Sequence, residues 1–325
     1  MKTINLPAIP RNWDELKPEQ MVNLNRIRYE QGQSKENFLF HAFCLLTEMK
    51  VKTSETDEDG NVYYLFSHKT QKDFIPLMAW QVHFFIAENL KFLTEDCTRL
   101  VDVFPTIKLK GKTFGSPGYA MAGMTYQQYK KAQEHIGYYQ RLTQKIANEV
   151  KDMESGKRKP DTERIQSLIA ERKRVKGRFM AAVYTPETEV RQRTVDGQLV
   201  VCNPPEKAYV FSPRQIDTYG EWFEEMNDSE TDAVIQLFSG TMFNYRKMFP
   251  LLFAENEGGK THNMNFIQIE SSTMNALQAK LNFNNYQTIY DANAPFILEK
   301  LHAIIKEGKA LDEQHRKMKS HRNKA

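Results

Sequence analysis

The sequence predicts an α+β protein that is mainly α-helical, with a helical body, two small β-hairpins and one protruding charged helical segment. Apolar residues recur at spacings of three and four over most of the chain, which is the period of an amphipathic helix. Two Asp-Gly pairs, Asp59-Gly60 and Asp196-Gly197, lie between short strand-like runs and predict hairpins near 50–67 and 189–201. Hydrophobic residues make up 40% of the 325 positions, which is enough for a packed core.

The N-terminal helical region is expected to cover residues 1–150. Pro18 suits the first turn of a helix that ends near Gly32, and Ser34 suits the N-cap of a second helix. The apolar stripe of this second helix consists of Phe38, Leu39, Ala42, Phe43, Leu45, Leu46 and Met49. The hairpin near 50–67 then follows.

The second half of this region combines a core helix, a loop and a long helix. Residues 74–93 predict a core helix with a break at Pro76. The aromatic residues expected in the core are Trp80, Phe84, Phe85 and Phe92. Residues 111–123 hold four glycines and predict an irregular loop. Thr125 then suits the N-cap of a long helix over 126–150.

The remainder of the chain divides by its charge pattern. Residues 151–178 are expected to form a charged linker and helix, although this segment and its flanking helix could instead form one protruding helical hairpin. A C-terminal helical region over 179–308 contains the hairpin near 189–201. Residues 309–325 are basic and polar, and we expect a disordered tail there.

The net charge of +4 is unevenly distributed. Residues 145–178 carry a net +5 and residues 306–324 a net +4, so the rest is mildly acidic. This separation supports a nucleic-acid-binding hypothesis, although charged helices are usually just solvated. The candidate phosphate contacts are Lys157, Arg158, Lys159, Arg172, Lys173 and Arg174.

Motifs for catalysis or metal binding are missing from the sequence. The three cysteines have no zinc spacing, and neither H-E-x-x-H, G-x-S-x-G nor G-x-G-x-x-G occurs. We therefore expect no catalytic residue, metal or cofactor and no enzymatic activity, with a site assembled from distant residues as the alternative.

The same sequence gives expectations about location. The N-terminal residues lack an apolar signal-peptide core, and no apolar run reaches the roughly 18 to 20 residues of a membrane helix. We expect a cytoplasmic or virion-associated protein without membrane contact.

The central apolar segment is a helix over 228–253, with a kink or end at Pro250. Its apolar residues cover more than one face, so it needs neighbours on more than one side. Where those neighbours leave it uncovered, we expect a partner-binding surface at Met242, Phe243 and Phe249.

The N-terminal segment resembles a recurrent opening of tail-module proteins of tailed phages and prophages. The resemblance rests on Leu6-Pro7, on Trp13 to Leu16, on Pro18 to Gln20, on Gly32 and on the apolar helix from Phe38 to Leu46. Those proteins are similar to tail assembly chaperones. The resemblance implies a non-enzymatic chaperone or structural component that binds a helical tape-measure-like tail protein, and it carries over no catalytic residue.

Overall fold

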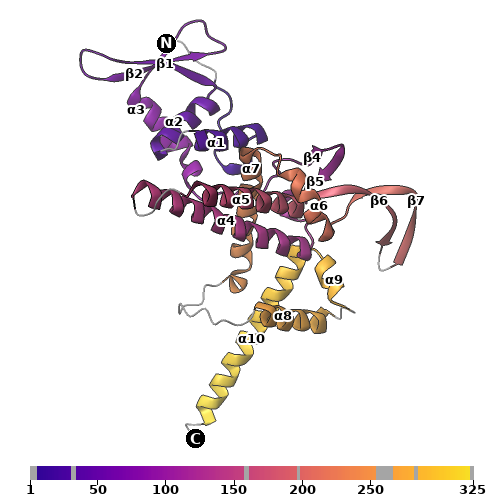
Figure 1. Ribbon diagram of the computed structural model, residues 1–325. Helices are drawn as coiled ribbons and strands as arrows, with labels where there is room; N and C mark the ends of the chain where they lie inside the picture. The colour runs from indigo at the N-terminus through magenta and orange to yellow at the C-terminus, as the bar shows by residue number, and fades with distance from the viewer. Residues whose placement is uncertain are drawn as a thin grey trace. The chain divides into compact units, whose positions relative to one another are not determined.

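The computed structural model describes residues 6–30, 34–156, 161–195, 198–253, 266–281 and 285–322. The chain is α+β and mainly helical, with two small antiparallel sheets of three and four strands (Figure 1). This confirms the predicted fold class. The two predicted hairpins are present, and each is part of a sheet that contains further strands.

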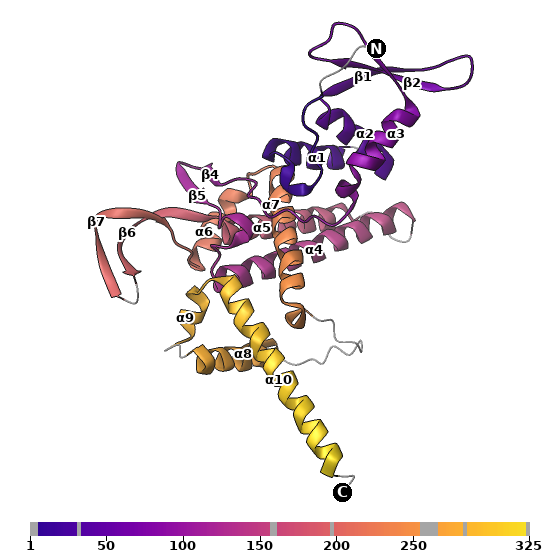
Figure 2. The ribbon, with the colours of Figure 1, turned by 180° about the vertical axis from the view of Figure 1, so that it is seen from behind.

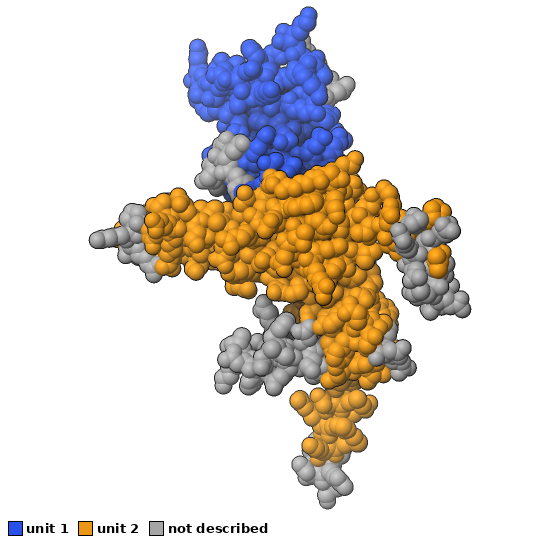
Figure 3. Space-filling view, turned by 45° about the vertical axis from the view of Figure 1, so that its right-hand side comes forward, with its two compact units in different colours: residues 1–104, 226–241 blue, residues 105–225, 242–325 orange. Residues whose placement is uncertain are grey.

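The chain forms two compact units, shown in blue and orange in Figure 3. Unit 1 comprises residues 1–104 and 226–241, and unit 2 comprises residues 105–225 and 242–325. The helix α7 (Asp228–Met248) contributes residues to both. The units therefore do not follow the divisions at 150 and 178 that the charge pattern suggested, because burial of apolar side chains rather than charge determines which elements pack together.

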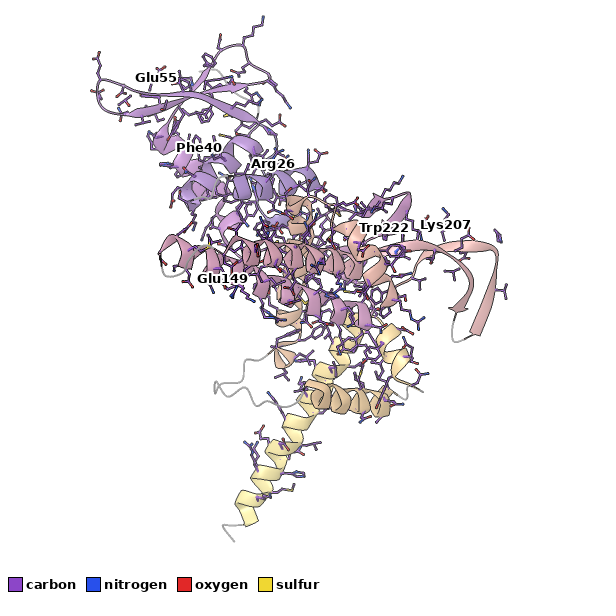
Figure 4. All side chains as sticks on the ribbon, viewed as in Figure 1. Arg26, Phe40, Glu55, Glu149, Lys207 and Trp222 are labelled. Atoms are coloured by element: carbon purple, nitrogen blue, oxygen red, sulfur yellow. The ribbon has the colours of Figure 1, made fainter. Side chains whose placement is uncertain are left out.

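Unit 1 contains the helices α1 (Pro18–Glu30), α2 (Lys35–Leu46) and α3 (Ala79–Asn89), with short 3-10 turns η1 (Trp13–Glu15) and η2 (Lys91–Thr94). The Ser34 hydroxyl accepts a hydrogen bond from the Asn37 backbone N–H, which confirms the predicted N-cap of α2. Phe40 of α2 (labelled in Figure 4) packs its ring against Tyr64 and Phe66 of the sheet. The helices and the sheet thus share one aromatic core.

The sheet of unit 1 has the order β1-β2-β3, with β1 (Met49–Thr56), β2 (Val62–His68) and β3 (Ile75–Met78). The first two strands confirm the hairpin near 50–67. The third strand corrects the predicted helix over 74–93, since that helix begins only at Ala79. Pro76 explains the difference, because proline lacks a ladder donor and is tolerated in an edge strand.

Unit 2 is built on a long helical hairpin of α4 (Tyr126–Glu154) and α5 (Thr162–Val183), which lie side by side in Figures 1 and 2. Thr125 and Gln128 form the predicted N-terminal cap as a reciprocal capping box. Arg164 pairs with Glu149 at 2.7 Å and joins the helices near their connection. The sequence left two interpretations open for residues 151–178, a charged linker followed by a helix or one helical hairpin. The structure shows the helical hairpin, because α4 continues into the segment where the linker was expected.

The sheet of unit 2 has the order β4-β5-β6-β7, with β4 (Thr106–Leu109), β5 (Lys112–Gly115), β6 (Thr185–Val195) and β7 (Gln198–Tyr209). The hairpin near 189–201 is confirmed and is longer than predicted. The predicted loop over 111–123 is wrong at its start, where β5 lies. Lys110 and Gly111 have φ values of 46° and 79°, the left-handed pair that a tight two-residue hairpin turn requires.

Unit 2 also contains η3 (Tyr119–Met121), α6 (Arg214–Phe223), η4 (Pro250–Leu252), α8 (Phe266–Leu281), α9 (Tyr286–Asp291) and α10 (Ala294–Arg322). Trp222 of α6 (labelled in Figure 4) contacts the ring of Phe114 on β5. The helix α7 ends at Met248, and Pro250 starts a 3-10 turn, as the sequence predicted. A separate small core joins α8, α9 and α10.

The basic tail is helical, which corrects the expectation of disorder over 309–325. The helix α10 continues through Gly308 to Arg322, with Glu313 and Lys317 paired at 2.7 Å one turn apart. Residues such as Lys, Ala, Leu, Glu and Gln favour helix strongly enough to offset a single glycine, which costs about 1 kcal/mol. The last three residues lie outside the described part of the chain.

We expect Gly308→Ala to stabilise the distal half of α10 by about 1 kcal/mol. Nothing lies within 4 Å of the position that the added Cβ would occupy, so only the helix propensity changes. Amide hydrogen exchange of residues 305–319 measures the effect as slower exchange. The matched variant Ala310→Gly should speed exchange instead, and equal exchange in both would contradict the helical tail.

Candidate functional site

The predicted partner surface at Met242, Phe243 and Phe249 is not an exposed patch. Phe249 is 6% exposed, and its ring contacts those of Tyr245 and His302 at 6.1 and 6.0 Å. Met242 and Phe243 are half-buried, and the Lys247 ammonium lies 4.3 Å from the centre of the Phe243 ring. Phe249 therefore belongs to the core of unit 2, which corrects the expectation for this residue.

The most exposed aromatic side chains on a described helix lie on α3 in unit 1. Trp80 and Phe84 are 62% and 63% exposed, and their four-residue spacing places them on one face. The exposed residues His83, Ala87 and Glu88 lie beside them on the same face. We call Trp80, His83, Phe84, Ala87 and Glu88 the α3 face.

The opposite side of α3 explains why the helix holds its position. Val82 is buried in the core of unit 1, and Phe85 and Ile86 pack against that core. The indole N–H of Trp80 donates to the Met78 sulfur at 2.9 Å, so its polar atom already has a partner. A short helix anchored by one apolar face thus presents a second one to solvent.

Sequence reasoning placed Trp80 and Phe84 in the core together with Phe85 and Phe92. A signal for the α3 face was nevertheless present. At about 100° per residue, Trp80 and Phe84 point to the side opposite Val82, Phe85 and Ile86. Two opposed apolar stripes on so short a helix need two neighbours, and unit 1 covers only one of them.

A second exposed apolar stripe lies on α10 in unit 2. Ile297 and Leu301 are buried with Met274 and Leu277 of α8, and Ile304 packs against the same cluster. The same three-four spacing continues through Gly308, Leu311, His315 and Met318. Leu311 and Met318 are 56% and 59% exposed. The spacing is that of a coiled-coil seam, of which α8 covers only the first part.

The predicted basic residues fall into two groups. Lys157, Arg158 and Lys159 lie outside the described residues. On α5, Lys173 and Arg174 are exposed and Arg172 is half-buried. The adjoining Glu171 accepts a hydrogen bond from the Tyr138 hydroxyl. The structure therefore brings together three of the six residues, within one helical turn that also carries an acidic side chain.

The titratable groups of the described residues offer few reactive centres. Burial raises the pKa of the Cys44 and Cys97 thiols to about 11, so both are protonated near neutral pH and are poor nucleophiles. Burial also lowers the pKa of His135. Among the described residues, no three His, Cys, Asp or Glu side chains are grouped so that they could hold a metal ion.

No helix in the described part of the chain has both the length and the apolar character needed to cross a bilayer.

Comparisons with protein-family models, curated proteins and solved structures found no match to this chain.

Proposed function

We propose that this chain is an interaction protein that binds a helical protein partner through the α3 face. The observation that carries the proposal is the exposure of Trp80 and Phe84, each above 60%, on a helix whose other side is fixed in a core. Exposed apolar patches on folded proteins mark interaction sites, and tryptophan is the residue most enriched among those that dominate binding energy.

The geometry of the α3 face suits a helix better than a flat surface. Two aromatic side chains lie one turn apart on this face, with the small Ala87 beside them. An amphipathic helix presents apolar side chains at spacings of three and four, which matches the spacing of Trp80 and Phe84. The exposed seam on α10 has the same periodicity and supports a helical partner for unit 2 as well.

The biological setting that we propose comes from the resemblance of residues 6–46 to tail-module proteins of phages and prophages. In that setting the chain acts as a tail assembly chaperone or structural component. Its partner is a tape-measure-like helical tail protein. The exposed aromatic side chains of the α3 face can pack against the apolar face of such a helical partner.

Replacing Trp80 and Phe84 by serine is expected to weaken binding to the proposed tape-measure-like helical partner by at least about 30-fold. Truncating one of the few residues that dominate the binding energy of an interface costs about 2 kcal/mol or more, which is about 30-fold in affinity. Isothermal titration calorimetry measures the change. Both side chains are exposed, so circular dichroism should show unchanged folding.

The matched control is Met248→Ser, which removes an apolar side chain that is 53% exposed on α7. We expect this variant to bind like the parent. Equal affinities for the parent, the Trp80 and Phe84 variant and the control would rule out the α3 face as the binding site.

A nucleic-acid-binding function is the alternative, and the exposure of the adjacent Lys173 and Arg174 on α5 favours it. Replacing both by glutamine should then weaken binding to duplex or single strands and reduce the salt dependence of the affinity. The pI of about 8.7 is below the value above 9 that is usual for dedicated binding domains. No binding at low salt would exclude this alternative.

A further inference from the structure

A cavity of about 710 Å³ lies within unit 1, at the end of α2 and the adjoining strands β1 and β2. Its volume is within the range of small-molecule sites, roughly 300 to 1,000 Å³. The apolar part of its lining includes Ile27, Leu45 and Met49, all of which are packed in or against the core of unit 1. The cavity therefore has an apolar interior that the fold holds in place.

The exposed part of the lining is basic. It includes Lys50, Lys52 and Lys69 against the single carboxylate of Glu48. Glu48 pairs with Lys69, and this hydrogen bond lowers the pKa of Glu48. Among the described residues, no ion pair is formed by the ammonium groups of Lys50 and Lys52. Two positive charges thus remain without a neutralising partner at the cavity.

The strand geometry brings both lysines to the same cavity. The pairing of β1 with β2 shifts between Val51 and Thr53, which leaves Lys52 without a Cα partner on β2. A bulge of this kind redirects a side chain and often occurs beside functional sites. Lys52 at this irregularity and Lys50 just before it both line the cavity.

His68 supplies an independent observation. It lines the cavity, is 5% exposed, and leaves its Nε2 atom without a hydrogen-bond partner. Its Nδ1 atom lies 2.7 Å from the Thr70 hydroxyl oxygen and accepts a hydrogen bond from the Thr70 backbone N–H at 3.3 Å. A buried polar atom without a hydrogen-bond partner is rare and costly in a folded protein.

We propose that this cavity binds a small organic anion with an apolar body, such as a medium-chain carboxylate. The apolar chain occupies the space beside Leu45 and Met49, and the carboxylate lies at Lys50 and Lys52. His68 lies on the same wall of the cavity. Among the described residues, no arginine lines the cavity, so the site offers point charges rather than the fork that recognises phosphate in a bidentate manner. The site is separate from the α3 face.

Titration of the full chain with decanoate, below its micelle-forming concentration, tests the proposal. We expect saturable binding by calorimetry and a shift of the His68 side-chain nitrogen signals in NMR spectra. Decanol and decylamine have the same chain without the negative charge, and they should bind at least about tenfold more weakly.

The variant Lys50→Gln with Lys52→Gln should weaken decanoate binding at least about tenfold. The matched control, Lys35→Gln with Lys72→Gln, removes two exposed lysines outside the cavity lining and should leave affinity unchanged. All four side chains are exposed, so folding is expected to persist and circular dichroism verifies it. Three results would overturn the proposal: no decanoate binding, equal binding of decanol, or equal loss in both double variants.

Discussion

Gly177→Ala is expected to lower the free energy of unfolding of unit 2 by about 2 kcal/mol. Gly177 lies on α5 where it crosses α6, and an added Cβ would lie 2.2 Å from the Gly220 carbonyl oxygen. That atom belongs to the backbone of a helix and cannot move alone. Overpacking of this kind costs about 1 to 3 kcal/mol and occasionally more, which exceeds the gain of about 1 kcal/mol from replacing a helical glycine.

Two further glycines of unit 2 provide a graded control for this prediction. A Cβ at Gly220 would meet the flexible Arg178 side chain at 3.1 Å, so Gly220→Ala should cost less. A Cβ at Gly137 of α4 would meet only the Arg141 side chain at 3.7 Å, so Gly137→Ala should be stabilising. Urea denaturation of the three variants gives the order. A Gly177→Ala variant as stable as Gly137→Ala would show that α5 and α6 do not cross this closely.

Arg99→Met is expected to destabilise unit 1 by about 3 kcal/mol or more. Arg99 is 1% exposed, and its guanidinium donates to the carbonyl oxygens of Trp13 at 2.6 Å, Leu16 at 2.9 Å and Asp102 at 3.3 Å. Burial lowers its pKa. Hydrogen bonds from charged groups contribute about 1.5 to 3 kcal/mol each, and methionine leaves the buried carbonyls without donors.

The variant Arg99→Lys separates charge from geometry. Lysine keeps the positive charge but cannot reproduce the fork that reaches several carbonyls at once, so this variant should also be destabilised. Arg11→Met, which removes an exposed arginine, should be close to neutral. Thermal unfolding followed by circular dichroism measures all three. A melting temperature unchanged in Arg99→Met would contradict the structural role of this side chain.

Local signals made much of the fold predictable. Ser34 and Thr125 cap the helices they were expected to cap, and Pro250 ends α7. These features depend on neighbouring residues, which a single sequence displays. The strand β3 was missed because its structure depends on pairing with β2, which the sequence of β3 alone does not show. The turn at Lys110-Gly111 was missed because the glycine-rich segment 111–123 was predicted to be an irregular loop, whereas β4 and β5 pair across the turn.

The candidate sites were harder to predict, because exposure depends on which elements meet. The sequence shows that Phe249 and Trp80 are apolar, but only packing decides that the first is buried and the second is exposed. The cavity likewise forms where α2, β1 and β2 converge, and no single segment contains it. Arg99 illustrates the same limit, since its acceptors Trp13 and Leu16 are more than eighty positions away.

Hydroxyl-radical footprinting of the chain with and without its helical partner tests the central claim most directly. We expect strong labelling of Trp80 and Phe84 in the free chain, and at least about fivefold weaker labelling in the complex. Trp13, which is 5% exposed, provides an internal reference for a buried indole. The claim is contradicted if Trp80 in the free chain reacts no faster than Trp13, or if its labelling stays the same when the partner is bound.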